Sequence, residues 1–228
     1  MDGGRGMSGL VARLRALDAC AVSDALDTLG LPGAVTGLGP LWPVDRTVAG
    51  RVRTIRVAPK EGDRPGTHIG TPAVADARDG DVIVIDNRGR TDVSCWGGIL
   101  TVAARQAGVA GVIVDGACRD IAESHELGLP VFGRAVVPVS ARGRIVQDAM
   151  DVPVTIAGHL VHPGAYVVAD RSGIAFVPAD PASAERVIAL AERIAEREAR
   201  MIAAVRDGRP VTEVMHDSAF PRPDEETT

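Results

Sequence analysis

The sequence predicts one α/β domain over residues 1–228, and three observations support this fold class. First, a strand pattern at Val82–Ile85, a helix pattern at Gly98–Gly108 and a strand pattern at Gly111–Val114 follow one another. This order is typical of a strand–helix–strand unit with parallel strands. Second, a long amphipathic helix is expected over Pro181–Arg206. Third, hydrophobic residues make up 46% of the chain, enough for one large core, and no repeat or linker divides it.

Before this unit, the sequence predicts helices and one strand separated by loops. Ser23 and Asp24 are expected to cap the second helix. In the strand predicted at 48–58, arginines alternate with Val and Ile, so one side of the strand is expected to face solvent. In chain order the elements are helices 10–17 and 22–29, a loop at 30–40, strand 48–58, a loop at 59–72 and helix 71–77. The strand that starts at Val82 is expected to end at Asn87-Arg88-Gly89.

The second half of the chain is predicted to contain one short helix and several short strands ahead of the long helix. Asp170-Arg171-Ser172-Gly173 has the composition of a hairpin turn. The elements are helix 119–127 and strands 131–132, 136–138, 152–156, 166–169 and 174–177. The Gly-rich residues 1–9 and the polar residues 221–228 are expected to be flexible.

Composition argues against several classes of protein. The formal net charge of −5 leaves no basic surface, so we expect no nucleic-acid partner. No apolar segment reaches the roughly twenty residues that cross a bilayer, and neither a membrane span nor a signal peptide is expected. The three cysteines lack CxxC spacing and cannot all pair within one chain, which favours a reduced, cytoplasmic location.

The residues best suited to chemistry follow the strand at 111–114. Arg119, Asp120 and Glu123 come after a glycine-containing turn, and burying such charges without a partner or ligand is costly. Residues three apart share a helix face, so Asp120 and Glu123 are expected to point into one space and to suit Mg²⁺ or Mn²⁺. Arg119 offers a planar fork for a carboxylate or a developing oxyanion. The same residues also fit a capped helix with a surface ion pair.

Gly97-Gly98, at the start of the next helix, is a second candidate. Free N–H groups and the helix dipole favour an anion there, and glycine lets a ligand approach the backbone. The sequence has neither a P-loop nor a dinucleotide fingerprint at this point, and the pair also fits tight packing. In a parallel unit, Gly98 and Arg119 fall at the carboxyl ends of strands, where open α/β sheets bind ligands.

Histidines and cysteines rank lower as site residues. The histidines at positions 68, 125, 159 and 162 lack both convincing metal-ligand spacing and a nearby nucleophile signature. Cys95 and Cys118 are expected to be small buried residues.

Taken together, these residues resemble the family of the regulator of ribonuclease E activity A (RraA-like), which includes the 4-hydroxy-4-methyl-2-oxoglutarate aldolases. The most specific match is Trp96-Gly97-Gly98 followed, after twenty residues, by Arg119-Asp120-x-x-Glu123. The likeness covers about residues 20–180 and also includes Val22–Leu26, Gly80–Asp86, Gly128–Phe132, Pro163-Gly164 and Asp170–Ile174.

The resemblance implies a single-domain, three-layer α/β/β swivelling fold, like that of phosphohistidine domains. It implies assembly as a homotrimer or a dimer of trimers, with active sites between subunits. It also implies that Asp120 holds the divalent metal and that Arg119 contacts the pyruvyl group of a substrate, with Glu123 taking over part of the network of water around the metal.

The remaining site residues also come from the resemblance. Gly97, Gly98 and the backbone of Ile99 and Leu100 would hold the substrate carboxylate, and Asp24 would reach in from a neighbouring subunit. The chain departs from the family's aldolases at Gly98, where they carry an Asp that helps to place an active-site water.

The implied activity is that of a metal-dependent (class II) carbon–carbon lyase acting on small 2-oxo acids. Such an enzyme cleaves substrates of the 4-hydroxy-4-methyl-2-oxoglutarate type to pyruvate, or decarboxylates oxaloacetate. A divalent metal would act as a Lewis acid, and Arg119 would add positive charge where the pyruvate enolate forms. Two other hypotheses stand beside it: a non-catalytic regulator that binds a ribonuclease, and a lyase or hydrolase acting on another small oxo- or hydroxy-acid.

Overall fold

The structure is a computed structural model that describes residues 3–62 and 66–216, with backbone only for residues 3–8. The helices are α1 (Gly3–Arg15), α2 (Ala19–Thr28), α3 (Thr71–Ala75), α4 (Gly98–Gln106), α5 (Ile121–Glu126), α6 (Pro181–Arg206) and α7 (Val211–Val214). The strands are β1 (Ala34–Val35), β2 (Gly39–Pro40), β3 (Val48–Pro59), β4 (Val82–Ser94), β5 (Gly111–Cys118), β6 (Val131–Gly133), β7 (Ala135–Val136), β8 (Ile145–Met150), β9 (Val154–Ile156), β10 (His159–Val161), β11 (Tyr166–Ala169) and β12 (Ile174–Val177).

A ten-stranded mixed sheet forms the centre of the domain, with strand order β1-β12-β11-β3-β4-β5-β6-β2. Strand β7 pairs with β5, β8 pairs with β3, and β9 and β10 form a separate hairpin. Strands β3, β4, β5 and β6 are parallel, and α4 connects β4 to β5. The predicted parallel strand–helix–strand unit is therefore confirmed, as is the long helix α6 over Pro181–Arg206.

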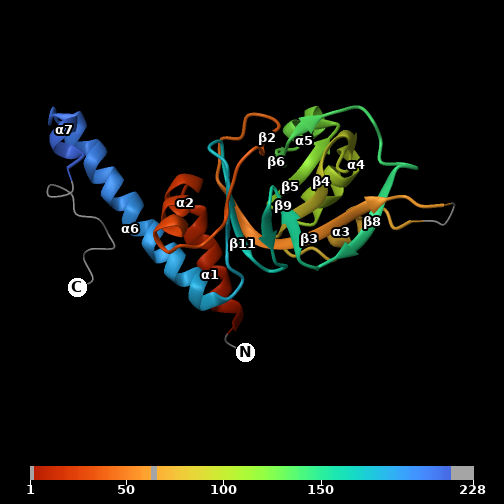
Figure 1. Ribbon diagram of the computed structural model, residues 1–228, viewed down its shortest axis with the longest axis horizontal. Coiled ribbons are helices and arrows are strands. Elements are labelled where there is room, and N and C mark those ends of the chain that lie inside the picture. The colour runs from red at the N-terminus through yellow and green to blue at the C-terminus, as the bar shows by residue number, and fades with distance from the viewer. Residues whose placement is uncertain (1–2, 63–65, 217–228) are drawn as a thin grey trace.

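The elements form the layers of a three-layer α/β/β swivelling fold (Figure 1). On one face of the parallel strands lies an apolar core that includes Ile83, Trp96 and Leu100 and takes in α3 and α4. On the other face, a core that includes Val84 and Phe176 joins the parallel strands to β9–β10 and to β11–β12. A further core packs α1, α2 and α6 on the outer side of β11 and β12. Among the described residues, no helix combines the length and apolar composition needed to cross a membrane.

The two N-terminal helices begin earlier than predicted. Helix α1 starts at Gly3, so the backbone of residues 3–9 is helical rather than loose. Helix α2 starts at Ala19 because its N-cap is Asp18, which accepts a hydrogen bond from Ala21 N–H at 2.7 Å, rather than Ser23 or Asp24. The predicted flexible segment 221–228 lies outside the described residues.

Two strands of the parallel unit are longer than predicted. Strand β4 continues past Asn87 to Ser94 through two register shifts, and Arg88 and Gly89 take positive φ values of 56° and 69° there. Strand β5 continues to Cys118, beyond the predicted end at Val114, because β4 pairs with residues 115–117 and β7 pairs with residues 117–118. Arg119 therefore follows the strand directly, with no intervening turn.

Candidate active site

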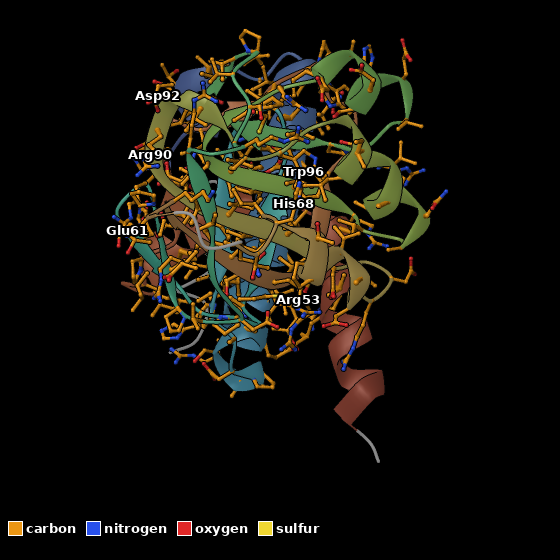
Figure 2. The ribbon with its side chains drawn as sticks, turned by 90° about the vertical axis from the view of Figure 1, so that its right-hand side faces the viewer. Arg53, Glu61, His68, Arg90, Asp92 and Trp96 are labelled. Carbon is orange, nitrogen blue, oxygen red and sulfur yellow. The ribbon has the colours of Figure 1, made fainter. Side chains whose placement is uncertain are left out.

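A cavity of about 360 Å³ lies where three parallel strands end. Lys60 follows β3, Cys95 follows β4 and Arg119 follows β5, and all three residues line the cavity. Figure 2 looks onto this face, and shows Trp96 and His68, two further lining residues, close together near its centre. Because the carboxyl ends of parallel strands are the usual ligand site of open α/β sheets, this cavity is the candidate active site.

Helix α4 begins at the cavity with unsatisfied backbone donors. Its N-cap, Gly97, has extended backbone (φ −164°, ψ −173°) and no side chain that could accept a hydrogen bond. The next N–H, that of Gly98, donates to Asp120 Oδ2 at 2.9 Å. Within the described residues, the N–H groups of Ile99 and Leu100 donate to no acceptor, as expected for the first turn of a helix. Two donors at the positive end of a helix are therefore available to an anion.

Arg119 and Asp120 lie directly against this helix start. Asp120 has a left-handed backbone (φ 55°, ψ 42°), which is unfavourable for a non-glycine residue and common at functional sites. Its Oδ2 lies 3.3 Å from Arg119 Nε, and the two side chains are 37% and 40% exposed, so both can meet a ligand. A Cβ placed on Gly97 would lie 2.7 Å from Asp120 Oδ2, so only glycine leaves room for the carboxylate in this position.

A buried polar network fixes the start of α4 against α5. Trp96 Nε1 donates to Thr101 Oγ1 at 3.0 Å, and the Thr101 hydroxyl lies 3.1 Å from Ser124 Oγ and 3.1 Å from the Gly97 carbonyl oxygen. The side chains of Trp96, Thr101 and Ser124 are buried. Since satisfied buried networks hold their members in one arrangement, this network positions the Gly97 backbone relative to the helix that follows Asp120.

The structure brings most of the predicted site residues together. Arg119 and the backbone of residues 97–100 line the cavity, and Asp120 contacts Gly98. Glu123 is exposed on α5 and does not line the cavity within one chain. We predicted one helix face for Asp120 and Glu123, but Asp120 is the N-cap of α5 with left-handed backbone, so helical spacing does not relate the two side chains.

Asp24 lies in a different part of the same chain. It is exposed on α2, which packs with α6 in the outer helical layer. Figure 1 shows α2 and α6 on the side of β11 opposite to α4 and α5. Within one chain Asp24 therefore lies away from Arg119, and its predicted role requires a neighbouring subunit.

The Asp120 carboxylate beside the cavity fits a divalent metal that keeps most of its water ligands. Across residues 3–62 and 66–216, no group of three or more His, Cys, Asp or Glu side chains is placed to hold a metal ion. However, Asp120 Oδ1 has no hydrogen-bond partner among the described residues, and the carboxylate reaches solvent. Mg²⁺ binds through one or two carboxylates and retains several waters, so Asp120 suits it, whereas structural zinc needs about four protein ligands.

The two cysteines near the cavity are not candidates for a nucleophile. Burial raises the pKa of both the Cys95 and the Cys118 thiol far above the ordinary range, so neither forms a thiolate at neutral pH. Their predicted role as small buried residues is confirmed.

Three basic residues of the cavity wall were not predicted as site residues: Lys60, His68 and Arg142. Lys60 and His68 lie in the segment predicted as a plain loop, and Arg142 lies just before β8, a strand that the sequence pattern did not predict. His68 Nδ1 lies 2.9 Å from Thr71 Oγ1 and 3.0 Å from the Ile69 carbonyl oxygen. For Lys60 alone the sequence held a sign of a special role, because it is the only lysine of the chain.

Comparison with known proteins identifies the family. The family model described as RraA-like, Aldolase/RraA, matches residues 19–176. Protein DlpA of Legionella pneumophila is 28% identical over 217 residues; the match covers 95% of this chain but only 35% of DlpA. A 4-hydroxy-4-methyl-2-oxoglutarate aldolase of Thermus thermophilus is 31% identical over 133 residues, which cover 58% of this chain and 77% of that protein.

Solved structures agree with the sequence comparisons. An uncharacterized protein from Pseudomonas syringae superposes with a TM-score of 0.82 and 30% identity, covering 92% of this chain and 98% of the other. RraAS2 of Streptomyces coelicolor, described as an unusual member of the RNase ES inhibitor RraA protein family, superposes with a TM-score of 0.74 and 28% identity over 85% and 96% of the two chains.

Proposed function

The chain belongs to the RraA-like family, and on that premise we propose that it is a lyase that cleaves a carbon–carbon bond of a small 2-oxo acid. One observation carries the proposal: the Arg119 guanidinium and two unsatisfied N–H groups of α4 line the same cavity, beside the Asp120 carboxylate. These groups match the charge that such a reaction develops. Relatives named as 4-hydroxy-4-methyl-2-oxoglutarate aldolases support the reaction class.

The substrate carboxylate binds at the start of α4, where the N–H groups of Ile99 and Leu100 have no other acceptor. When the bond between C3 and C4 breaks, its electron pair moves toward the 2-keto oxygen as the enolate of pyruvate forms. Arg119 donates to that oxygen and stabilises its negative charge, and Asp120 keeps the guanidinium in place from 3.3 Å. Water beside Asp120 Oδ1 takes the proton of the C4 hydroxyl group and returns a proton to C3.

Asp120 is the residue that would hold a divalent metal. A bound Mg²⁺ or Mn²⁺ supplies Lewis acidity, which withdraws electrons from the keto group. Glu123 and an Asp24 from a neighbouring subunit are proposed to orient water around it, which requires the trimeric or hexameric assembly that we also propose.

The proposal is tested by measuring pyruvate release from 4-hydroxy-4-methyl-2-oxoglutarate and from oxaloacetate, before and after treatment with EDTA. Turnover of at least one substrate is expected, with loss of activity on chelation and recovery with Mg²⁺ or Mn²⁺. Arg119→Lys should lower turnover about a hundredfold, because an ammonium group cannot reproduce the planar fork. Absence of turnover with both substrates and both metals would contradict the proposal.

A second candidate function is regulation of a ribonuclease, which the similarity to RraAS2 favours. A regulator does not need Arg119 and Asp120 at a cavity. If the chain inhibits a ribonuclease, and Arg119→Lys inhibits as well as the wild type, then binding of the ribonuclease is separate from the cavity.

A further inference from the structure

We propose that His68 is the proton carrier of the site: it holds the proton that leaves the substrate during cleavage and gives it back for addition to C3. This inference rests on the proposed function, in which water beside Asp120 moves that proton. It names the side chain with which the water exchanges it.

The proposed cleavage moves one proton and needs a place to keep it. The proton leaves the C4 hydroxyl group as the bond between C3 and C4 breaks, and the C4–O bond becomes a carbonyl group. The electron pair of the broken bond forms the enolate, and a proton added to C3 then completes the methyl group of pyruvate. Hydronium loses its proton at once at neutral pH, so a side chain that titrates near neutrality is needed between the two steps. Asp120 is assigned to the metal, and a carboxylate that ligates a metal carries no proton.

His68 is the side chain of the cavity wall that suits this task. Among the described lining residues, the other ionisable side chains are those of Lys60, Cys95, Arg119 and Arg142. Lysine and arginine keep their protons at neutral pH. Burial raises the pKa of the Cys95 thiol far above its ordinary range, so this group keeps its proton as well. Imidazole, in contrast, gains and loses a proton near neutral pH.

The loop that carries His68 is fixed on both sides of this residue. The Gln147 N–H donates to the Thr67 carbonyl oxygen at 3.1 Å, and the Gly70 N–H donates to Gln147 Oε1 at 3.0 Å. Between these two contacts, the Ile69 side chain is buried. The loop is therefore tied to β8, and His68 has a defined position at the cavity.

The same loop packs against the start of α4, where the substrate carboxylate is proposed to bind. A Cβ placed on Gly70 would lie 3.2 Å from the Trp96 ring and 3.3 Å from Leu100 Cδ1, so the backbone passes close to both side chains. His68 lies two residues before Gly70, at most about 7 Å away along the chain. Figure 2 shows His68 and Trp96 close together. The imidazole and a ligand at the start of α4 therefore share one cavity, in which a single water can join them.

The contacts of the imidazole favour the form that accepts a proton at Nε2. His68 Nδ1 lies 3.0 Å from the Ile69 carbonyl oxygen and 2.9 Å from Thr71 Oγ1. A carbonyl oxygen only accepts, so the first contact is a hydrogen bond when Nδ1 carries a proton. The neutral ring then has its lone pair on Nε2. Because the Ile69 carbonyl also accepts from the charged ring, a proton can come and go at Nε2 without rearrangement.

Exchange of the pyruvate methyl protons for deuterium tests the inference, because it uses the same proton position, C3, and needs no second substrate. Pyruvate is incubated with the enzyme and Mg²⁺ in D₂O, and the methyl signal is followed by proton NMR. His68→Ala should slow the exchange about a hundredfold. His68→Asn should slow it as much, although asparagine keeps an N–H group close to the position of Nδ1. Added imidazole should speed exchange by His68→Ala about tenfold and leave the wild type unchanged.

His125→Ala is the matched control. His125 lies on α5, stacks on Trp42 with the ring centres 4.7 Å apart, and does not line the cavity, so exchange should stay at the wild-type rate. Oxalate, a mimic of the enolate, should bind His68→Ala within about threefold of the wild type in a calorimetric titration with Mg²⁺. A loss of oxalate binding as large as the loss of exchange would assign His68 to ligand binding and overturn the proton carrier.

The outcomes separate this inference from the proposed function. Wild-type exchange in His68→Ala or in His68→Asn, or a loss that imidazole does not restore, overturns the proton carrier and leaves the lyase proposal standing. Absence of exchange in the wild type also overturns the proton carrier. The lyase proposal falls with it only if pyruvate release from both substrates is absent as well.

Chemical modification provides an independent measurement. Diethyl pyrocarbonate acylates neutral imidazole, and mass spectrometry distinguishes the five histidines of the chain. With Mg²⁺ and saturating oxalate present, His68 should be modified several-fold more slowly, with His125 as internal reference. Equal modification of His68 with and without oxalate would contradict a place for its imidazole beside the bound ligand.

Discussion

Substitution of Gly97 by alanine tests whether the contact between Asp120 and the start of α4 sets activity. The added Cβ would lie 2.7 Å from Asp120 Oδ2 and 3.1 Å from Arg119 Cγ and Nε. To restore an ordinary contact of 3.4 Å, the Asp120 carboxylate must move by about 0.7 Å, which breaks its 2.9 Å hydrogen bond from the Gly98 N–H. Displacements of about 1 Å at reacting groups cost up to about a hundredfold in rate. We therefore expect turnover of Gly97→Ala to fall about 10- to 100-fold.

The assay is pyruvate release under saturating substrate, with the melting temperature and far-UV circular dichroism as checks on the fold. Gly97 has extended backbone, which alanine adopts without strain, so the fold should be retained. Gly98→Ala is the matched control, because its Cβ would lie 3.4 Å from Asp120 Cβ, an ordinary contact, and should leave activity within about threefold. Wild-type turnover in Gly97→Ala, or equal losses in both variants, would refute the reasoning.

Three further predictions follow from the contacts around the site and from the outer helices. Thr101→Val leaves the buried Trp96 N–H without an acceptor and should lower the free energy of unfolding by about 1–3 kcal/mol, measured by urea denaturation; an unchanged value would show that the network does not stabilise α4. Partial burial and repulsion from Asp24 raise the pKa of Glu198, so its contribution to folding is present at acidic pH and is lost as the pH rises through the folded pKa. Glu198→Gln should therefore raise the melting temperature at pH 7, by about 1 °C, and not at pH 4; an equal change at both would contradict this. Of the three thiols, only that of Cys20 is exposed, and a thiol reagent at pH 8 should modify one cysteine per native chain and three after denaturation.

The sequence predicted those features that depend on short-range patterns. The strand–helix–strand unit was predictable because its apolar segments, and the glycines that separate them, occur within one stretch of chain, from Val82 to Val114. Helix α6 was predictable because its amphipathic pattern extends over many turns. The same local signals located Gly97, at the start of the unit's helix, and Arg119, after its second strand. The chemistry assigned to them came from a family resemblance, and family membership is confirmed by the match over residues 19–176.

Other features depended on pairing between distant segments. No local pattern shows that β5 continues to Cys118, because the extension is stabilised by pairing with the far end of β4 on one side and with β7 on the other. Likewise, helical spacing to Glu123 did not reveal the left-handed backbone of Asp120 or its contact with Gly98, 22 residues earlier.

The sequence by itself therefore determined the elements of the parallel unit and one wall of the cavity, because those residues are close together along the chain. Only the tertiary structure decided the opposite wall, where Lys60 and Arg142 are brought together by pairing of β3 with β8. The physical reason is that periodicity and capping act within a few residues, whereas a cavity is bounded by side chains whose proximity arises only when the sheet has formed.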